Sequence, residues 1–292
     1  MRALAEKSAM GRKLSRRFVA GTQPEDALRI VKSLNDRRLA VSIDNLGENV
    51  TTADEAHASA RLYELLLDEI AVRRLDANVS LKLTHMGLDF DAGLAHKLVS
   101  DLVTKAKNVS PPNFVRVDME GSAYTERTLE LVRELHAVNP GCVGAVIQSY
   151  MRRSEADVEP LLAAGIRIRL CKGAYKEPAE IAFQKKSEVD ANYIKLMKIL
   201  LKSGIYHGLA THDARIINEA KAFATREGVA RDAFEFQMLH GIRRDLQRKL
   251  VREGWRMRVY VPFGSEWYPY LMRRLAERPA NMFFLMRNLL RK

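Results

Sequence analysis

Cysteine is almost absent from this chain of 292 residues, which contains only Cys142 and Cys171 and no CxxC pair. Two cysteines exclude a disulfide framework in a chain of this length, and they offer no metal-ligand spacing. Such low cysteine use is typical of proteins in a reducing compartment. We therefore expect a cytoplasmic protein.

The sequence also lacks any apolar run near the length of about 20 residues that crosses a bilayer, and it has no signal-peptide core. Its first residues, "MRALAEKSAMGRKLSRRF", are rich in arginine and nearly free of acids, as transit peptides are. We interpret them instead as a basic helix that packs on the fold. Any membrane contact is expected to be peripheral, at the inner face of the membrane.

Two common nucleotide-binding signatures are missing, because the chain contains neither GxGxxG nor GxxxxGK[ST]. Aromatic residues make up only 7% of the chain, and no RNA-binding signature is present. The formal net charge is nevertheless +12, which favours anionic partners such as nucleic acid, acidic lipid headgroups, phosphorylated cofactors or carboxylate substrates. A basic nucleic-acid-binding protein is one alternative, although we expect no nucleic-acid partner.

Eight short β-rich runs are present, and most are followed by a helical pattern. They are "LAVSIDNL" (39–46), "VSLKLTHM" (79–86), "FVRVDME" (114–120), "GAVIQSY" (144–150), "RIRLCKG" (167–173), "GLATHD" (208–213), "FEFQML" (234–239) and "RMRVYVPF" (256–263). Strands that alternate with helices predict a parallel sheet, and eight in succession without a linker predict an α/β fold of the closed (βα)8, TIM-like type. A doubly wound open sheet is the alternative. We expect a single domain, with a helical segment (1–38) packed on a barrel (39–292).

Two helical segments have clear starts or periods. Residues 51–70 begin with Thr52 and Glu55 as a capping box. The predicted apolar side of this helix consists of Leu62, Leu65, Leu66 and Ile70. In residues 124–138 the corresponding side consists of Thr128, Leu131, Val132 and Leu135.

Polar side chains end every predicted strand. They are Asp44 and Glu48; Lys82, Thr84 and His85; Asp118 and Glu120; Gln148; Arg169 and Lys172; Thr211, His212 and Asp213; Gln237 and His240; and Tyr260. In a (βα)8 barrel the carboxyl ends of the strands carry the chemistry. One polar strand end is ordinary, but a ring of eight predicts a functional site.

A short helix after the last strand carries polar side chains where an apolar stripe is usual. Its stripe, at i, i+3, i+4 and i+7, consists of Tyr270, Arg273, Arg274 and Glu277, and the helix ends before Pro279. Two guanidinium groups can hold one carboxylate or phosphate. We expect this helix to lie over the barrel mouth, held there by Leu271 and Leu275. The alternative is an exposed face with weak pairs such as Arg273–Glu277.

Two other chemistries are possible at these strand ends. Lys82 or Lys172 could form a Schiff base, as in an aldolase. A catalytic metal could be bound by His85, His212 and His240 together with Asp118 or Asp213. The sequence has no HxH or HxxxH pair, however, so we predict no metal.

Together these strand ends resemble the proline dehydrogenase family in its short, single-function bacterial form. The motifs are "DNLGE", "KLTHMG", "RVDMEG", "VIQSYMRR", "RLCKGAY", "ATHDA", "FEFQMLHG", "YVPFG" and "YLMRRLAERPAN", in the order of the family. The resemblance runs from about Leu39 to the C-terminus, and "RLCKGAY" with "YLMRRLAER" is specific. Lys176, Gly121 and Asp213 depart from the expected pattern.

The resemblance implies a distorted (βα)8 barrel whose last helix covers the strand ends. It also implies oxidation of L-proline to Δ1-pyrroline-5-carboxylate, the first step of proline catabolism. Hydride would pass from proline C5 to N5 of a noncovalent FAD, and a membrane quinone would then accept the electrons.

The resemblance further assigns roles to individual residues. Asp118 and Arg169 would be catalytic, beside the flavin. The substrate would be bound by Lys82, Arg273 and Arg274 at its carboxylate and enclosed by Leu170, Tyr175 and Tyr270, with Glu48 paired to the first helix arginine as a gate. The FAD contacts would be Met119, Gln148, Arg169, Lys172, Gly173, Ala174, Thr211, His212 and Gln237.

Overall fold

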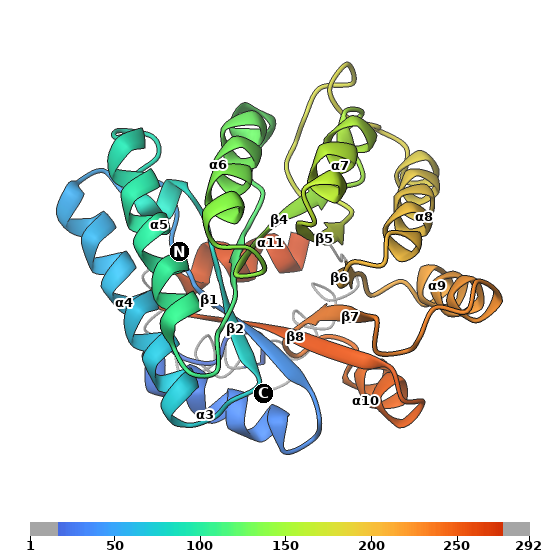
Figure 1. Ribbon diagram of the computed structural model, residues 1–292, viewed down its shortest axis with the longest axis horizontal. Helices are drawn as coiled ribbons and strands as arrows, with labels where there is room; N and C mark the ends of the chain where they lie inside the picture. Colours follow the sequence, from blue (N-terminus) through green and yellow to red (C-terminus); the bar gives the residue numbers. More distant parts are fainter. Residues whose placement is uncertain (1–16, 277–292) are drawn as a thin grey trace, which may run out of the picture.

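Eight parallel strands close into a barrel in the computed structural model, which describes residues 17–276 (Figure 1). They are β1 (Ala40–Asn45), β2 (Ala77–Leu81), β3 (Val115–Val117), β4 (Val143–Gln148), β5 (Arg167–Cys171), β6 (His207–Ala210), β7 (Phe234–Leu239) and β8 (Arg256–Phe263). Each strand pairs with the next in the chain, and β8 pairs with β1, with Asp44 opposite Pro262. The predicted (βα)8 barrel is therefore confirmed, and the open sheet is excluded.

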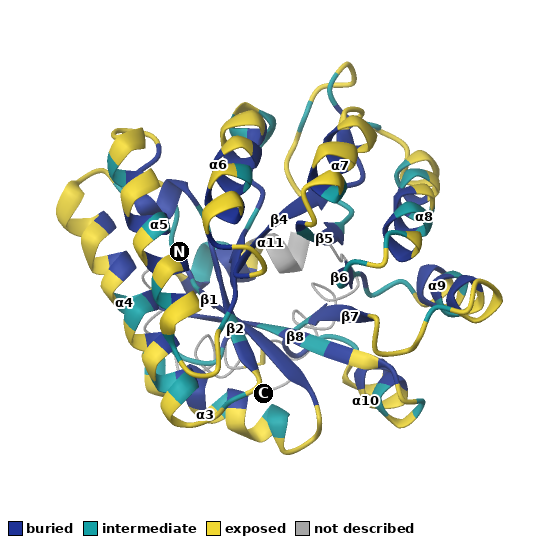
Figure 2. Ribbon diagram, viewed as in Figure 1, coloured by how far each residue is buried: buried dark blue, intermediate teal, exposed yellow. Residues whose placement is uncertain are grey.

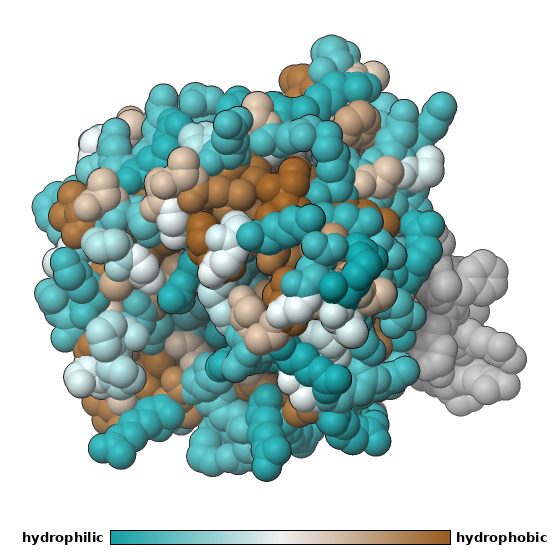
Figure 3. Space-filling view, turned by 45° about the vertical axis from the view of Figure 1, so that its right-hand side comes forward, coloured by the Kyte–Doolittle hydropathy of each residue, from teal (hydrophilic) through white to brown (hydrophobic). Residues whose placement is uncertain are grey.

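Helices surround the barrel and bury one face against it (Figure 2). They are α3 (Pro24–Asn35), α4 (Ala53–Val72), α5 (Ala92–Asn108), α6 (Thr125–Val138), α7 (Ser154–Ala163), α8 (Lys186–Lys202), α9 (Ala214–Arg226), α10 (Arg244–Arg252) and α11 (Trp267–Ala276), with short 3-10 turns η1 (Thr84–Met86) and η2 (Ser122–Tyr124). Among residues 17–276, no helix is long and apolar enough to cross a membrane. On the face seen in Figure 3 most of the surface is hydrophilic, and apolar side chains gather near its middle.

The capping box of α4 forms as predicted, because Thr52 accepts a hydrogen bond from the Glu55 backbone and Glu55 accepts one in return. The buried side of this helix runs through Tyr63, and Leu65 is 45% exposed. The prediction for Leu65 was wrong, because two residues turn a helix by about 200° and place it opposite Tyr63. The predicted side of α6 is buried throughout.

The N-terminal part of the described chain packs on the barrel. Helix α3 contacts β1 and β8. Phe18 and Val19 join an apolar cluster with Trp267 and Leu271 of α11. The division of the chain at residue 38 stays a prediction.

The interior of the barrel is polar, and its apolar side chains point outward to the helices. Arg169 of β5 hydrogen-bonds to side chains on β1, β2 and β7, and such contacts can form only across the barrel. Gly208 leaves room for this network, because a Cβ there would collide with Gln237. Gly144 serves a neighbouring contact, because a Cβ there would collide with the Arg167 carbonyl and crowd Arg116. Parallel strands are usually apolar on both faces. In these strands polar and apolar residues alternate, so the charged and hydrogen-bonding side chains lie on the inner face of the barrel.

Candidate active site

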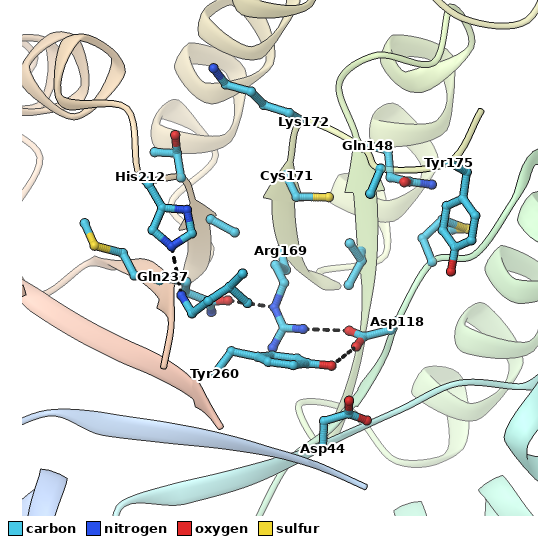
Figure 4. Close-up of a pocket in the computed structure, with 18 of the residues that line it drawn as sticks. Asp44, Asp118, Gln148, Arg169, Cys171, Lys172, Tyr175, His212, Gln237 and Tyr260 are labelled. Carbon is cyan, nitrogen blue, oxygen red and sulfur yellow. Dashed lines mark hydrogen bonds and ion pairs between the residues drawn. The ribbon is translucent and has the colours of Figure 1, made fainter. Parts of the chain in front are cut away.

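A cavity of about 590 Å³ lies at the carboxyl ends of the strands, in the place where barrel enzymes carry their chemistry (Figure 4). It is lined by most of the predicted site residues: Glu48, Lys82, Asp118, Met119, Gln148, Arg169, Lys172, Gly173, Ala174, Tyr175, Thr211, His212, Gln237 and Tyr270. It is also lined by Asp44, Cys171 and Tyr260, which were not among the residues assigned a role.

The floor of this cavity is an ion pair between Arg169 and Asp118. Nη1 of Arg169 lies 2.6 Å from Oδ1 of Asp118, and the two side chains are only 7% and 13% exposed. The guanidinium also donates to Gln237, at 2.6 Å, and to two serine hydroxyls, Ser80 at 2.9 Å and Ser42 at 3.0 Å. Because these partners come from β1, β2, β7 and the residue that follows β3, the guanidinium is held in one position.

Tyr260 of β8 completes the floor. Its hydroxyl donates to Oδ2 of Asp118 at 2.9 Å, while the guanidinium of Arg169 lies 5.3 Å from its ring centroid (Figure 4). Burial, with Asp118 next, raises the pKa of Tyr260 well above its ordinary value, so the phenol keeps its proton and acts as a donor. The role of Tyr260 could not be read from the sequence, because its partner Asp118 is 142 residues away.

Asp44, at the end of β1, lines the same cavity and points toward the Arg169–Asp118 pair (Figure 4). Its carboxylate is buried and accepts a long hydrogen bond, 3.3 Å, from the Tyr63 hydroxyl of α4. Burial is the main reason that its pKa rises from 3.8 to about 6; Asp118 adds to the rise, while Lys82 and the tyrosine hydroxyls oppose it. This carboxyl can therefore change its charge near neutral pH.

Lys82 and Glu48 form an ion pair at one side of the cavity, with 2.7 Å between Nζ and Oε1. Burial alone would lower the pKa of Lys82, but Asp44 and Glu48 outweigh it and the pKa is raised. The lysine is therefore a fixed cation. Nearby His85 is neutral, since burial and Lys82 lower its pKa to about 4.

Lys172 points away from the Arg169–Asp118 pair (Figure 4). Its ammonium lies 2.6 Å from Asp190 and 3.1 Å from Asp213. The two carboxylates have lowered pKa values, because their cationic partners outweigh the cost of burial. An ammonium between two carboxylates is not the neutral amine that a Schiff base needs, which argues against the aldolase alternative.

The loop after β5 approaches the cavity through its backbone. Gly173 has a φ of +110°, and a Cβ there would collide with the ring of Tyr150. Glu177 ties the loop to the turn after β3, accepting hydrogen bonds of 2.7 Å from both the backbone and the hydroxyl of Ser122. The neighbouring Gly121, one of the departures from the family pattern, lies beside this carboxylate.

Several predicted cofactor contacts already have protein partners. The amide nitrogen of Gln148 donates to the backbone of Glu120 at 2.9 Å. Nε2 of His212 accepts from the backbone of Leu239 at 3.0 Å, which leaves the ring proton on Nδ1. Both ends of the Gln237 amide are used by Arg169 and Glu235, so Gln237 positions the arginine and offers little to a cofactor.

One predicted substrate contact needs correction. Leu170 is fully buried in the main apolar core and does not line the cavity. Successive strand residues face opposite sides, so Arg169 and Cys171 of β5 point inward and Leu170 points outward. We therefore remove Leu170 from the wall of the substrate site.

Helix α11 lies over the strand ends, with Tyr270 and Leu271 buried. Arg273 and Arg274 belong to this helix, but their side chains, like that of Leu275, lie outside the described part of the chain, as does Glu277. Their proposed contacts stay predictions. Within residues 17–276, no three histidine, cysteine, aspartate or glutamate side chains are grouped to hold a metal ion.

Sequence reasoning missed Ser42, Ser80 and Glu235, and it placed Asp44 and Tyr260 at strand ends without assigning them a role. All five occupy alternate positions in their strands, interleaved with apolar residues. In a barrel this alternation separates the inner from the outer face. The same alternation is visible in the sequence and would have been sufficient to predict a polar interior.

A family model described as proline dehydrogenase matches residues 27–287. The chain belongs to the proline dehydrogenase family. It is similar to proline dehydrogenase 1 of Bacillus subtilis subsp. natto, with 41% identity over 95% of this chain and 91% of that one. It is also 40% identical to the proline dehydrogenase of Deinococcus radiodurans, over 95% and 90% of the two chains.

Among solved structures, the chain is similar to proline utilization A (PutA) from Bdellovibrio bacteriovorus inactivated by N-propargylglycine. The TM-score is 0.84 at 27% identity, and the match covers 91% of this chain but only 32% of that one. The chain therefore spans about a third of that larger protein. As a member of the proline dehydrogenase family it is an oxidoreductase that oxidises proline in proline catabolism, and this membership implies a flavin-dependent enzyme.

Proposed function

We propose that the protein oxidises L-proline to Δ1-pyrroline-5-carboxylate with a noncovalent FAD bound in the cavity, and that the electrons then pass to a membrane quinone. The observation that carries this proposal is the buried Arg169–Asp118 pair at the floor of a cavity of about 590 Å³. When bound, FAD would accept the hydride, a two-electron step that no protein side chain can perform.

The residues around the cavity fit such a cofactor. The cavity volume lies within the roughly 300–1,000 Å³ that is usual for ligand sites. Gly173 lets the backbone after β5 line the cavity while packing against the ring of Tyr150, where a side chain could not fit. The cofactor would be held by Met119, Gln148, Lys172, Gly173, Ala174, Thr211 and His212.

Arg169 would stabilise the negative charge that the cofactor gains on reduction. Its guanidinium is already oriented by Asp118, Gln237 and two serine hydroxyls, so no reorganisation is needed when the charge develops. Preorganised charge of this kind is effective where it is shielded from water, and the side chain of Arg169 is only 7% exposed. Asp118 in turn is the anchor that keeps the guanidinium in place.

The substrate carboxylate would be bound by Lys82 together with Arg273 and Arg274. The ammonium of Lys82 has three donors, so it can keep Glu48 and bind a substrate as well. Tyr175 and Tyr270, which line the cavity, would enclose the pyrrolidine ring and exclude water. Holding the carboxylate orients the C5–H bond, and orientation of this kind can lower a barrier by several kcal/mol.

The proposal is tested by the anaerobic absorption spectrum of the purified protein. We expect a flavin spectrum that L-proline bleaches, while D-proline, the matched control, leaves it unchanged. Protein that stays colourless after incubation with FAD would contradict the cofactor assignment. A bound flavin that L-proline leaves oxidised would contradict the substrate.

A further inference from the structure

Asp118 and Asp44 face each other inside the barrel but differ in their hydrogen-bond partners. Asp118 accepts hydrogen bonds of 2.6–2.9 Å from Arg169, Ser80 and Tyr260. Asp44 accepts from Tyr63 at 3.3 Å and shares the hydroxyl of Tyr260, which donates mainly to Asp118. The lone pairs of Asp118 are thus engaged, whereas those of Asp44 are largely free to accept a proton.

Oxidation of an amino acid at the carbon beside its nitrogen requires that nitrogen to be uncharged. Free proline carries a protonated ring nitrogen at neutral pH, and a nitrogen without a lone pair cannot form the new C=N bond. One proton must therefore leave before or during hydride transfer. The protein needs a proton acceptor only if it carries out this oxidation, so the inference of a base rests on the proposed function.

The other candidate bases in the described part of the cavity are engaged elsewhere. Glu48 is paired with Lys82, and Asp213 with Lys172. Nε2 of His212 already accepts a backbone hydrogen bond. Among the described residues, Asp44 is the carboxylate at the cavity floor that has neither a lysine nor an arginine within ion-pair distance.

The charged and titratable groups that face Asp44 come from four elements: Tyr63 of α4, Lys82 after β2, Asp118 after β3 and Tyr260 of β8. Behind them, Arg169 neutralises Asp118 and Glu48 neutralises Lys82. Burial dominates this balance and gives Asp44 a pKa of about 6. A base with such a pKa is deprotonated at neutral pH yet still strong enough to accept a proton.

We propose that Asp44 is the proton acceptor of the reaction. An N–H bond of bound prolinium breaks, and the proton passes to the Asp44 carboxylate. The C5–H bond would then break, the nitrogen lone pair would form the C5=N bond, and FAD, when bound, would accept the hydride with both electrons. The product would be the cyclic iminium, and Asp44 would later release its proton to solvent.

The kinetic test is the substitution Asp44→Asn, which keeps the shape of the side chain. We expect flavin bleaching by proline under anaerobic conditions to slow by about 10²–10⁴-fold at pH 7. In wild type the rate should fall as the pH drops through about 6. In the variant this acidic limb of the pH–rate profile should be absent. Its rate should instead rise about tenfold per pH unit toward alkaline pH, where proline loses its proton in solution.

Tyr63→Phe is the matched control, because it keeps the carboxylate and removes one hydrogen bond that lowers its pKa. Its acidic limb should move to higher pH while the maximal rate stays near wild type. A structural role for Asp44 would slow the variant equally at every pH. That outcome, or a wild-type profile in Asp44→Asn, would overturn the proposal.

A readout independent of turnover is the ¹³C NMR titration of aspartate carboxyl carbons in flavin-free protein. One resonance should titrate near pH 6 and be missing in Asp44→Asn. If that resonance persists in the variant, Asp44 is not the titrating group and the proposal fails. Failure of the proposed function is distinct, because wild-type flavin would then remain oxidised by proline while the titration could still be present.

Discussion

At the carboxyl ends of the strands the barrel holds Asp118 between Arg169 and Tyr260, and at the amino ends it holds Glu235 between Arg258 and Tyr206. The two clusters use the same kinds of residue and are joined through Gln237. The carboxyl-end cluster also contains a second, buried carboxylate with weak hydrogen bonds, Asp44. The two ends of the barrel therefore differ in how strongly their buried acids are hydrogen-bonded, and the weakly bonded acid lies at the end that carries the cavity.

The pKa values of Glu235 and Asp44, two buried acids, shift in opposite directions. Glu235 accepts from Arg258, Gln237 and Tyr206 at 2.6–2.9 Å, and these partners lower its pKa although burial opposes them. Among the described residues, Asp44 accepts only from tyrosine hydroxyls, at 3.3 Å from Tyr63, and burial raises its pKa to about 6. The comparison predicts that removing the charge of Glu235 weakens the fold, whereas removing that of Asp44 strengthens it.

The largest expected effect is on stability at the amino end. Glu235→Gln should lower the free energy of unfolding by about 3–5 kcal/mol, because it leaves the buried guanidinium of Arg258 without its counter-charge. Urea denaturation measures this loss. The double variant Glu235→Met with Arg258→Met should recover most of it. If the free energy of unfolding of Glu235→Gln lies within about 1 kcal/mol of the wild-type value, the charge of Glu235 does not stabilise the fold and the contrast with Asp44 fails.

A comparable effect, on activity, is expected at the carboxyl end. Arg169→Met should slow flavin reduction by proline about 10²–10³-fold while KM for proline changes little, because the lost charge acts when the cofactor is reduced. Anaerobic stopped-flow measurements at several proline concentrations give both quantities. Arg258→Met is the matched control: it should destabilise the protein yet leave the rate per folded molecule unchanged. Equal losses in the two variants would contradict the comparison.

The smallest expected effect is on stability at the carboxyl end, where removal of a buried charge should stabilise the fold instead of weakening it. The folded-state pKa of Asp44, about 6, lies above its ordinary value of 3.8, so between these pH values the folded chain binds more protons than the unfolded chain. Stability that depends on this group is therefore lost as the pH rises through the window. Asp44→Asn should gain about 1–3 kcal/mol in the free energy of unfolding at pH 8.

That gain should disappear near pH 4, where Asp44 is protonated in the folded wild type. Urea denaturation of flavin-free protein at the two pH values measures the difference. Equal stability of variant and wild type at pH 8 would show that the buried charge costs nothing.

Much of the fold was readable from the sequence, since all eight strands and the strand-end residues were predicted. The polar strand-end residues could be assigned to one site because the parallel strands of a barrel bring their carboxyl ends together. The roles of Tyr260 and Glu235 could not be predicted, because their contacts cross the barrel and depend on the relative height of distant strands. Leu170 was misplaced for a related reason: its neighbours Arg169 and Cys171 occupy the inner face, and one step along a strand reverses the side.

The closing strand gives this topology a consequence for the order of folding. Arg258 of β8 donates to the Val41 carbonyl of β1, 217 residues earlier in the chain, and Tyr260 of the same strand supplies the hydroxyl between Asp118 and Asp44. A nascent chain that has not yet released β8 from the ribosome contains every acid of both clusters but lacks the donors that complete them. Until that strand arrives, Asp118 lacks the hydroxyl of Tyr260 and Glu235 lacks its counter-charge Arg258, although their partners from earlier strands are already present.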